Sequence, residues 1–365
     1  MNQQSFWSGK RVFLTGHTGF KGAWLSHWLV SLGAMVKGYS LEPPTEPNLF
    51  DTLGLAADLE SDIGDIRDHE RLTASVMVFR PEIIFHLAAQ PLVRLSYREP
   101  RLTYETNVMG TLNLFEAVRA CDSVRSVVTI TTDKCYENKE WVWGYRETDP
   151  MGGYDPYSSS KACAELLTAA YRHSYFNPDA YGRSHGVSLA SARAGNVIGG
   201  GDWALDRLLP DCVRSLAKGV TISIRNPHAT RPWQHVLDPL AGYLVLAERM
   251  YTDGLGYCEG WNFGPGDEGV MDVENVVKTA IEAWGSGGYS ITPDADLHEA
   301  QLLKLDPSKA HARLGWSTKL DVRSAIRWSI DWYAGYYRGA NIVELMKAQI
   351  DEYMGHEAPV EEDWG

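Results

Sequence analysis

A strand, a glycine-rich turn and a helix follow one another close to the N-terminus, and this order constrains the fold more than any other feature. Residues 11–15 form a short apolar run, and residues 23–32 have the spacing of an amphipathic helix. Between them stand Gly16, Gly19 and Gly22, in the spacing G-x-x-G-x-x-G. Such glycines let the backbone approach a pyrophosphate, which binds at the helix N-terminus. The segment therefore predicts a dinucleotide-binding α/β unit.

Strand-like apolar runs alternate with helical patterns as far as about residue 200. After the first strand, the pattern predicts strands at residues 34–39, 59–63, 82–89, 127–130 and 187–194. Helical patterns cover residues 67–79, 103–120 and 157–176. Strands that alternate with helices form parallel sheets with helices on both faces. The sequence therefore predicts an α/β protein with a doubly wound parallel sheet, a Rossmann sheet.

The alternation becomes looser after residue 195, where Gly199, Gly200 and Gly201 interrupt the chain. Beyond them we expect short strands at 221–224 and 261–263 and helices at 205–218, 239–251, 273–284, 322–337 and 342–354. Residues 1–195, with about 232–265, would form the dinucleotide-binding domain. A smaller mixed α/β C-terminal substrate lobe would comprise about 196–231 and 266–354, followed by a disordered acidic tail at 355–365.

The composition excludes several classes of partner. The 365-residue chain has a net charge of −13, which disfavours nucleic acid and anionic membranes as partners. No apolar run approaches the ~20 residues that span a bilayer, and the first residues lack the pattern of a signal peptide. Five scattered cysteines fit reduced thiols and favour neither a disulfide framework nor a metal site. We expect a cytoplasmic protein without a metal.

Tyr157 and Lys161 are four residues apart in a predicted helix, so their side chains lie one turn apart on one face. A neighbouring cation favours the phenolate, and lowering a phenol pKa by roughly three units takes about 4 kcal/mol. Tyr157 would then be a usable base near neutral pH. The pair alone is more often a surface lysine beside a half-buried tyrosine. Thr132 strengthens the case, because it follows a predicted strand at the edge where α/β folds bind ligands.

Further residues are candidates for contact with a dinucleotide. Ser40 ends the second strand, where an acidic residue would favour NAD, and Glu42 stands two positions later, so NAD and NADP both stay open. Asp65 with Ile66 could bracket an adenine ring, or Asp65 could cap the next helix. Small or apolar residues that end the fourth strand would let a cofactor lie close: Leu87, Ala88 and Ala89.

Two polar residues have less specific interpretations. His86 is expected to be a packed strand residue rather than a catalyst. Asn107 is either a buried hydrogen-bonding group or a surface polar group.

Together these segments resemble the extended short-chain dehydrogenase/reductase family, and within it the nucleotide-sugar 4,6-dehydratases, over nearly the whole chain. The motifs that carry the resemblance are residues 15–22, 86–90, 107–111, 193–196 and 231–236, with Thr132, Tyr157 and Lys161. Within that family, residues 131–138 and 303–310 favour CDP-D-glucose as the substrate.

The resemblance implies a three-step reaction with NAD as the cofactor. Tyr157 takes the proton of the sugar 4-hydroxyl, which Thr132 helps to hold, while hydride leaves C4; Lys161 binds the nicotinamide ribose. Water is then eliminated across C5 and C6, and hydride returns to C6. The implied product is CDP-4-keto-6-deoxy-D-glucose, a precursor of the deoxysugars of O-antigen and lipopolysaccharide.

The elimination step needs an acid and a base. Asp133 matches the family's acid for the departing 6-hydroxyl, a role that requires a raised carboxyl pKa. Lys134 stands where related dehydratases carry a glutamate that removes the C5 proton. A lysine can be that base only if its pKa is depressed. Otherwise Lys134 stabilises the enolate electrostatically or is structural.

The resemblance also implies binding residues. The expected substrate contacts are Gln90, Asn196, Arg207, Arg231 and His298. Arg231 suits a diphosphate because a guanidinium binds two oxygens at once, whereas Arg207 and His298 fit a solvated surface equally well. Beyond the residues named above, the expected cofactor contacts of the glycine turn are His17, Phe20 and Lys21; His17 and Lys21 would contact the phosphates.

Other functions are open but less favoured. The sugar could carry dTDP, UDP or GDP instead of CDP. A nucleotide-sugar 4-epimerase would use the same threonine, tyrosine and lysine but needs no acid–base pair, so Asp133 and Lys134 argue against it. A non-catalytic dinucleotide-sensing scaffold conflicts with the intact Tyr157 and Lys161.

Relatives pair through a four-helix bundle, so we expect a homodimer or a dimer of dimers formed by residues 103–120 and 157–176.

Overall fold

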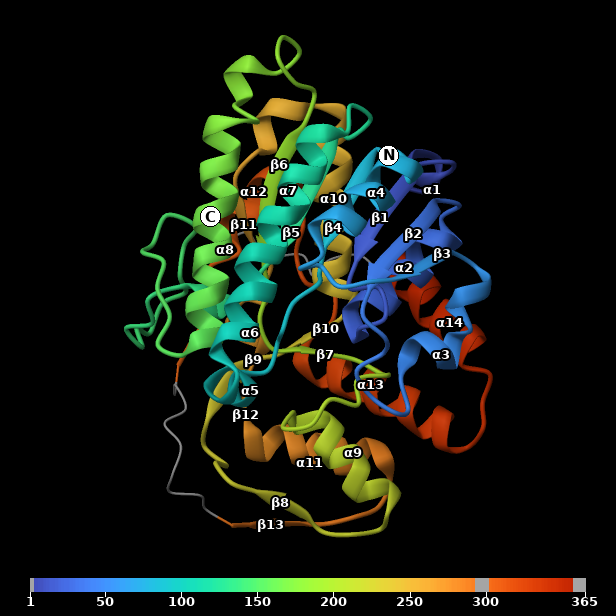
Figure 1. The fold of residues 1–365 in the computed structure, drawn as a ribbon. Helices are drawn as coiled ribbons and strands as arrows, with labels where there is room; N and C mark the ends of the chain where they lie inside the picture. Colours follow the sequence, from blue (N-terminus) through green and yellow to red (C-terminus); the bar gives the residue numbers. More distant parts are fainter. Residues whose placement is uncertain (1–2, 293–301, 357–365) are drawn as a thin grey trace.

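The computed structural model describes residues 3–292 and 302–356, and its largest element is a seven-stranded sheet (Figure 1). The strands are β1 (Arg11–Thr15), β2 (Met35–Ser40), β3 (Glu60–Ile63), β4 (Ile83–His86), β5 (Ser126–Ile130), β6 (Ser188–Arg193) and β11 (Gly260–Asn262). Their order is β3-β2-β1-β4-β5-β6-β11, and all neighbours are parallel. The predicted doubly wound Rossmann sheet is confirmed.

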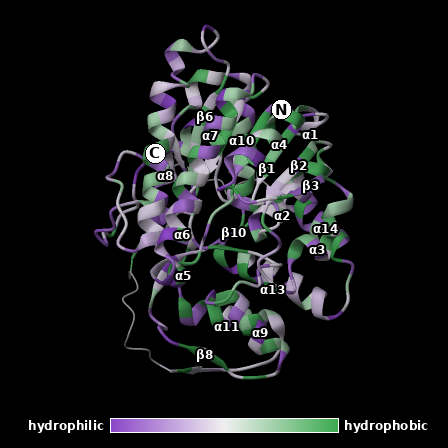
Figure 2. Ribbon diagram, viewed as in Figure 1, coloured by the Kyte–Doolittle hydropathy of each residue, from purple (hydrophilic) through white to green (hydrophobic). Residues whose placement is uncertain are grey.

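Helices cover both faces of this sheet, as a parallel sheet with two apolar faces requires. One face carries α4 (His69–Phe79), α7 (Gly110–Ala120) and α8 (Pro156–Ser174). The opposite face carries α2 (Phe20–Ser31), α10 (Leu237–Thr252) and α12 (Ser308–Leu314). Successive residues of β1 enter different cores, Phe13 on the first side and Leu14 on the second. Helices such as α7 and α8 show both hydrophobic and hydrophilic residues, as expected for helices with one buried face (Figure 2).

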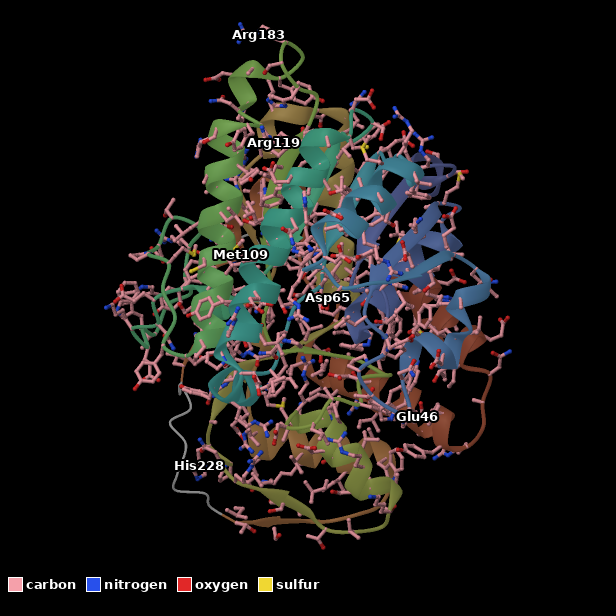
Figure 3. All side chains as sticks on the ribbon, viewed as in Figure 1. Glu46, Asp65, Met109, Arg119, Arg183 and His228 are labelled. Carbon is pink, nitrogen blue, oxygen red and sulfur yellow. The ribbon has the colours of Figure 1, made fainter. Side chains whose placement is uncertain are left out.

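A smaller lobe lies below the sheet in Figure 1 and contains His228 (Figure 3). It comprises α9 (Leu208–Ala217), α11 (Val273–Trp284), the parallel pair β8 (Ile222–Ile224) and β13 (Tyr289–Ile291), and the antiparallel pair β9 (Thr230–Pro232) and β12 (Val270–Asp272). Buried Cys212, Leu216, Ile222 and Val277 form its core. The predicted mixed α/β character of this lobe is therefore confirmed.

The remaining elements connect and flank these two parts. The parallel pair β7 (Val197–Ile198) and β10 (Gln234–His235) lies between the sheet and the lobe in Figure 1. The other helices are α1 (Gln3–Trp7), α3 (Leu49–Leu53), α5 (Val93–Arg98), α6 (Pro100–Tyr104), α13 (Val322–Tyr337) and α14 (Ile342–Gly355).

The helix predicted at 103–120 is interrupted. It consists of α6, a π-helical turn (Glu105–Met109) and α7. The π-turn carries Asn107, which is 1% exposed; it accepts a hydrogen bond from Gln90 N at 2.8 Å and donates to Ser160 Oγ at 2.8 Å. π-turns of this kind usually serve a specific local contact. Asn107 is thus the buried hydrogen-bonding group of the two alternatives.

His86 also has the packed role predicted for it. Its ring nitrogens lie 2.7 Å from Thr15 Oγ1 and 2.9 Å from Thr111 Oγ1. Burial lowers its pKa to about 3, with Lys161 adding to the effect, so the imidazole is neutral at physiological pH.

The described residues also bear on membrane-spanning helices, metal sites and cysteine pairing. Among residues 3–292 and 302–356, no helix is long and apolar enough to cross a bilayer, and no cluster of three or more histidine, cysteine or acidic side chains could hold a metal. All five cysteines are free thiols, so the prediction that they form no disulfide framework is confirmed.

One buried carboxyl joins three segments of the C-terminal region. Asp238 of α10 is fully buried, and its Oδ1 accepts hydrogen bonds from Lys319 N at 2.8 Å and Tyr353 OH at 3.0 Å. Burial raises the pKa of Asp238 to about 7 from an ordinary value of 3.8, and its hydrogen bonds only partly oppose this.

The Asp238→Asn variant should therefore change how stability depends on pH. In the wild type, the folded state holds the Asp238 proton to higher pH than the unfolded state, so this group's contribution to stability is lost as pH rises from about 4 to about 7. We expect the wild type to lose more unfolding free energy than the variant across this window, as measured by urea unfolding. Asp351→Asn, at an exposed position of α14, is the control. Parallel pH curves for all three proteins would contradict the expectation.

Candidate active site

The glycine turn between β1 and α2 is closely packed. Gly16 has a φ of 79°, and a Cβ there would lie 2.7 Å from Ala88 N. A Cβ on Gly22 would lie 2.0 Å from Gly16 O. No side chain caps the N-terminus of α2, where Gly19 is the capping residue. Only glycine fits this cradle, which has the features of a pyrophosphate site.

The cradle lies where the order of the sheet reverses. The strands on the two sides of β1 are β2 and β4, and their chain connections run in opposite directions across the sheet. Leu87 N donates to Thr15 O at 3.1 Å, and Ala88 N donates to Thr15 Oγ1 at 3.2 Å. The residues after β4 thus lie against the glycine turn, as the sequence predicted. Ligands of open α/β sheets bind at such switch points.

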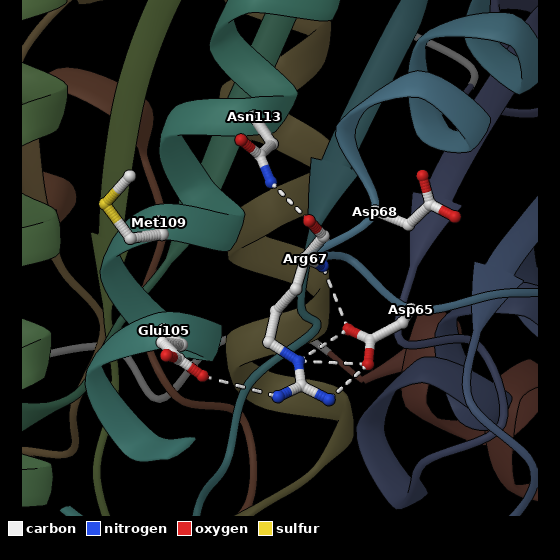
Figure 4. Close-up of a pocket in the computed structure, with 6 residues that line it drawn as sticks. All are labelled: Asp65, Arg67, Asp68, Glu105, Met109 and Asn113. Atoms are coloured by element: carbon white, nitrogen blue, oxygen red, sulfur yellow. Dashed lines mark hydrogen bonds and ion pairs between the residues drawn. The ribbon is translucent and has the colours of Figure 1, made fainter. Parts of the chain in front are cut away.

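Asp65 and Ile66 lie together at the end of β3. Two nitrogens of Arg67 donate to the Asp65 carboxylate, and Arg67 also forms an ion pair with Glu105 at 3.5 Å (Figure 4). These hydrogen bonds hold the pKa of Asp65 below its usual value. The cap of α4 is Asp68, which accepts from Arg71 N, so the alternative role of Asp65 as the helix cap is wrong.

Two other expected cofactor residues lie at the neighbouring strand ends. Ser40 Oγ is 2.9 Å from Thr18 Oγ1, at the end of β2. Ile66 is 5% exposed and packs against Gly110 of α7. Phe20, the first residue of α2, packs partly buried against the main core.

The side chain of His17 is engaged within the protein, and its predicted contact with the phosphates stays a prediction. Its Nε2 lies 2.8 Å from Ser61 Oγ, and the ring packs edge-on against Phe50 at 5.2 Å. Burial lowers its pKa to about 4, although Asp62 opposes this. The imidazole is therefore neutral and fills the space between β2 and β3.

Tyr157 enters the site from the first turn of α8. That helix begins at Pro156 because Asp155 caps it, accepting hydrogen bonds from Ser158 N at 2.9 Å and Ser158 Oγ at 2.6 Å. The phenol of Tyr157 interacts with the Thr132 side chain, which favours the phenolate and so opposes the rise of the Tyr157 pKa.

Thr132 in turn connects the phenol to the expected acid. It follows β5 and caps the 3-10 turn Asp133–Cys135, and its hydroxyl donates to Asp133 Oδ1 at 2.8 Å. Tyr157, Thr132 and Asp133 are 8%, 6% and 2% exposed. The structure therefore brings a phenol, a hydroxyl and a carboxyl into one buried series.

Three cations surround this series. The Lys161 ammonium donates to Ile130 O at 3.3 Å, and burial lowers its pKa to about 8. The Lys21 ammonium donates to Tyr243 OH at 2.9 Å; burial, Lys161 and Arg207 lower its pKa to about 7, and Asp133 opposes them. Lys21 thus belongs to the reaction site, and a phosphate contact is not its only role.

Arg207 completes the cluster from the N-terminal end of α9. Its Nη1 forms an ion pair with Asp202 Oδ2 at 2.8 Å, and its charge interacts with Tyr157 and with Lys21. The Arg207 side chain is 37% exposed, so it lies at the edge of the cluster in contact with solvent, and both predicted roles stay open. Asp202 and Tyr243 were not predicted, because their partners come from distant parts of the chain.

The pKa of Tyr157 does not follow the sequence prediction. Burial raises it to about 12, whereas the interaction with Thr132 and the charge of Arg207 oppose this. The expected lowering by Lys161 is therefore wrong for this structure, because the loss of hydration of the phenolate outweighs the nearby cations.

The expected substrate residues fall into different environments. Gln90 is 6% exposed; its amide donates to Leu92 O and Thr103 Oγ1, and its carbonyl accepts from Leu92 N. Its side chain is thus fully engaged within the protein, and the prediction of a substrate contact is not supported. His298 lies outside the described residues.

Asn196 and Arg231 lie on connected segments between the sheet and the lobe. Asn196 has a left-handed backbone with a φ of 47°, and its carbonyl accepts from Gln234 N at 3.3 Å. Arg231 is in β9, three residues before Gln234, and its Nη1 donates to Thr230 O at 2.9 Å. The positions of Asn196 and Arg231 are compatible with both residues binding one ligand.

Gly195 and Lys134 both lie near Asp133, but in different environments. A Cβ on Gly195 would lie 2.2 Å from the Asp133 carboxyl, so the chain leaving β6 passes directly against the acid. Lys134 is partly exposed, and its ammonium makes no hydrogen bond or ion pair with any residue that the structure describes. The structure therefore places Lys134 at the site's edge.

Known proteins resemble this chain along most of its length. Residues 13–328 match the family described as GDP-mannose 4,6 dehydratase. The chain is 54% identical over 355 residues to the CDP-glucose 4,6-dehydratase of Salmonella typhimurium, covering 97% of this chain and 99% of that protein. It is 28% identical over 337 residues to the dTDP-glucose 4,6-dehydratase of Streptomyces antibioticus, covering 88% and 92%.

Solved structures share the fold. A dTDP-glucose 4,6-dehydratase from Bacillus anthracis in complex with NAD matches with a TM-score of 0.74 and 20% identity, over 92% of this chain and 100% of that chain. A UDP-glucose 4-epimerase from Stenotrophomonas maltophila with bound NAD and formylated UDP-arabinopyranose matches with a TM-score of 0.78 and 19% identity, over 91% and 100%. At these identities the likeness concerns the fold alone.

The cradle yields a test by substitution. We expect Gly22→Ala to weaken dinucleotide binding by about tenfold or more, because the added methyl group would overlap the Gly16 carbonyl and such overpacking costs about 1–3 kcal/mol. Calorimetric titration with NAD measures the effect. Gly256→Ala is the control, since a Cβ there meets no atom within 4 Å. Equal affinity of all three proteins would show that the cradle holds no dinucleotide.

Proposed function

The chain belongs to the GDP-mannose 4,6 dehydratase family, and from this premise we propose that it converts CDP-D-glucose to CDP-4-keto-6-deoxy-D-glucose and water, with NAD as the cofactor. The 54% identity to a CDP-glucose 4,6-dehydratase supports the choice of sugar nucleotide. One observation carries the chemistry: Thr132 interacts with the Tyr157 phenol and donates a hydrogen bond to a buried carboxyl, Asp133. An oxidation needs the first of these groups, and an elimination needs the second.

The residues of the cradle fit a dinucleotide. Gly16 and Gly22 leave room for a pyrophosphate, and the ends of β2 and β3 offer Ser40 and Asp65 to the adenosine. The cations nearby are already paired, Lys37 with Glu60 and Arg71 with Asp62. This pairing disfavours the extra phosphate of NADP. NAD, when bound, supplies the acceptor and donor of hydride.

In the oxidation step, Tyr157 takes the proton of the sugar 4-hydroxyl and Thr132 orients that hydroxyl. Burial opposes the phenolate, so the site must stabilise it. The interaction with Thr132 and the charge of Arg207 already favour the phenolate, and Lys161 lies one helical turn away. A cationic nicotinamide would act in the same sense.

In the elimination step, Asp133 gives its proton to the departing 6-hydroxyl. The carboxyl is 2% exposed, and Gly195 packs against it, so bulk water is excluded from this side. Lys134, at the edge of the site, is the candidate base for the C5 proton. Its alternative role is to stabilise the enolate as a cation.

Arg207 and Arg231 are proposed to bind the diphosphate, and Asn196 to contact the diphosphate or the sugar. Arg207 is tied to Asp202 at the edge of the reaction cluster. Asn196 accepts a hydrogen bond from Gln234 at the start of β10, three residues after Arg231. In a chain with a net charge of −13, this local concentration of cations favours an anionic substrate at one place.

Several organisational features are proposed with the function. Residues 1–195 and about 232–265 would form the dinucleotide-binding domain, and about 196–231 and 266–354 the substrate lobe. A homodimer through α7 and α8 is supported by exposed apolar residues at or near them: Met109, Leu166 and Tyr175. The enzyme would act in the cytoplasm, in the synthesis of deoxysugars for surface polysaccharides.

Product analysis tests the proposed function. We expect incubation with NAD and CDP-D-glucose to give a product lighter by one water, seen by mass spectrometry, and less or no product from dTDP-, UDP- and GDP-hexoses or with NADP. The Tyr157→Phe variant is the matched inactive control. A product of unchanged mass would show a 4-epimerase, and no turnover of any nucleotide sugar would contradict an enzymatic role.

Substitution of the acid and the candidate base should separate the two steps. We expect Asp133→Asn to retain oxidation at C4 but to lower turnover by about a hundredfold, the usual range for loss of an acid–base group.

Lys134→Met should abolish uptake of solvent deuterium at C5, measured by mass spectrometry of the product. Lys139→Met, which removes an exposed lysine of the same loop, is the control. Undiminished deuterium uptake in Lys134→Met would assign the base to another group.

A further inference from the structure

A buried ion pair lies directly behind the reaction site. Glu165 on α8 and Arg193 at the end of β6 have side chains that are 3% and 6% exposed, and Arg193 Nη2 donates to Glu165 Oε2 at 2.8 Å. Burial alone would raise the pKa of Glu165, but Arg193 and the donors around it hold that pKa below its usual value. The two side chains are therefore a charged pair in the protein interior.

Glu165 fixes the chain just before the reactive segment, residues 132–135. Its Oε1 accepts a hydrogen bond from the Thr131 hydroxyl at 2.5 Å, and its Oε2 accepts one from the Ser191 hydroxyl at 2.6 Å. Thr131 N also donates to Ala192 O at 2.8 Å. The carboxylate thus joins α8, the end of β5 and β6 at one point.

Arg193 fixes the chain just after the reactive segment. Its Nη1 donates to Tyr136 OH at 2.5 Å, and Tyr136 OH donates to Asn262 Oδ1 at 2.8 Å. Tyr136 is 1% exposed. The residues on either side of the reactive segment, Thr131 and Tyr136, are therefore both held by the same ion pair.

The pair also acts on the lysine of the site. Glu165 stands four residues after Lys161 on α8, one helical turn away. Its negative charge favours the Lys161 ammonium against the cost of burial. Glu165 therefore connects α8, and with it Lys161, to the segment that carries Thr132 and Asp133.

We propose that the Glu165–Arg193 ion pair positions the reactive segment against Tyr157 and Lys161, so that Thr132 and Asp133 meet the same sugar. This role rests on the proposed dehydratase function and adds residues that do not touch the substrate. A buried pair is a weak source of net stability compared with apolar side chains of the same size. Its contribution is the placement of Thr131 and Tyr136.

The first test compares kinetic constants for CDP-D-glucose. We expect Glu165→Gln and Thr131→Val each to lower kcat by about tenfold to a hundredfold with little change in KM, since a small misplacement of reacting groups has effects of this size. Thr131→Val keeps every charge and removes one hydrogen bond, so it serves if Glu165→Gln does not fold. Tyr353→Phe, which loses a buried hydrogen bond to Asp238 far from the site, is the matched control and should keep both constants.

The second test does not require turnover. Amide hydrogen exchange, followed by mass spectrometry, should accelerate in peptides containing residues 131–136 in Glu165→Gln and Thr131→Val, but not in Tyr353→Phe. Unchanged exchange in this segment, or wild-type kcat in both variants, overturns the positioning role. Absence of turnover in the wild type, with the exchange result as expected, contradicts the proposed function and leaves the positioning of the segment established.

Discussion

The removal of charged groups from water around one phenol is the constraint on which the rest of the site depends. Lys161 of α8 is 7% exposed and would be costly to bury alone, whereas Arg207, just before α9, keeps 37% of its side chain exposed, and Lys21 of α2 interacts with both. Asp133 and Asp202 offset part of this cost. The arrangement leaves two ammonium groups with pKa values near 7 and 8, so small electrostatic changes on binding a ligand alter their protonation.

The sequence predicted those features of the fold and the site that are determined by residues close together along the chain. The strand–glycine–helix unit, the parallel sheet and the four-residue spacing of Tyr157 and Lys161 follow from local patterns, and the structure contains them. The sequence did not show the partners of two candidate residues. Gln90 and His17 contact Thr103 and Ser61, which lie 13 and 44 residues away, and no local pattern shows such partners. The same holds for the pKa of Tyr157, which is governed by burial among segments distant in sequence.

The net charge of the chain and the local charge near Tyr157 are opposite in sign. The chain carries −13 overall, yet the part of the crevice that faces Tyr157 is rich in cations. The net charge disfavours nucleic acid and anionic membranes as partners, and it gave no indication of where an anionic substrate binds. The π-turn at Glu105–Met109 was not predicted either, because no sequence pattern marks it. It places Asn107 between Gln90 and Ser160, and both lie outside the turn.

Gly195 sits on the path by which the chain leaves β6 for the smaller lobe, and it touches the Asp133 carboxyl. The segment that leaves the sheet for the smaller lobe therefore also lines the surroundings of the Asp133 carboxyl. This limits modular redesign. A lobe borrowed from a relative to accept a different nucleotide would have to be spliced beyond residue 196, because any bulkier residue at the junction would shift the acid itself.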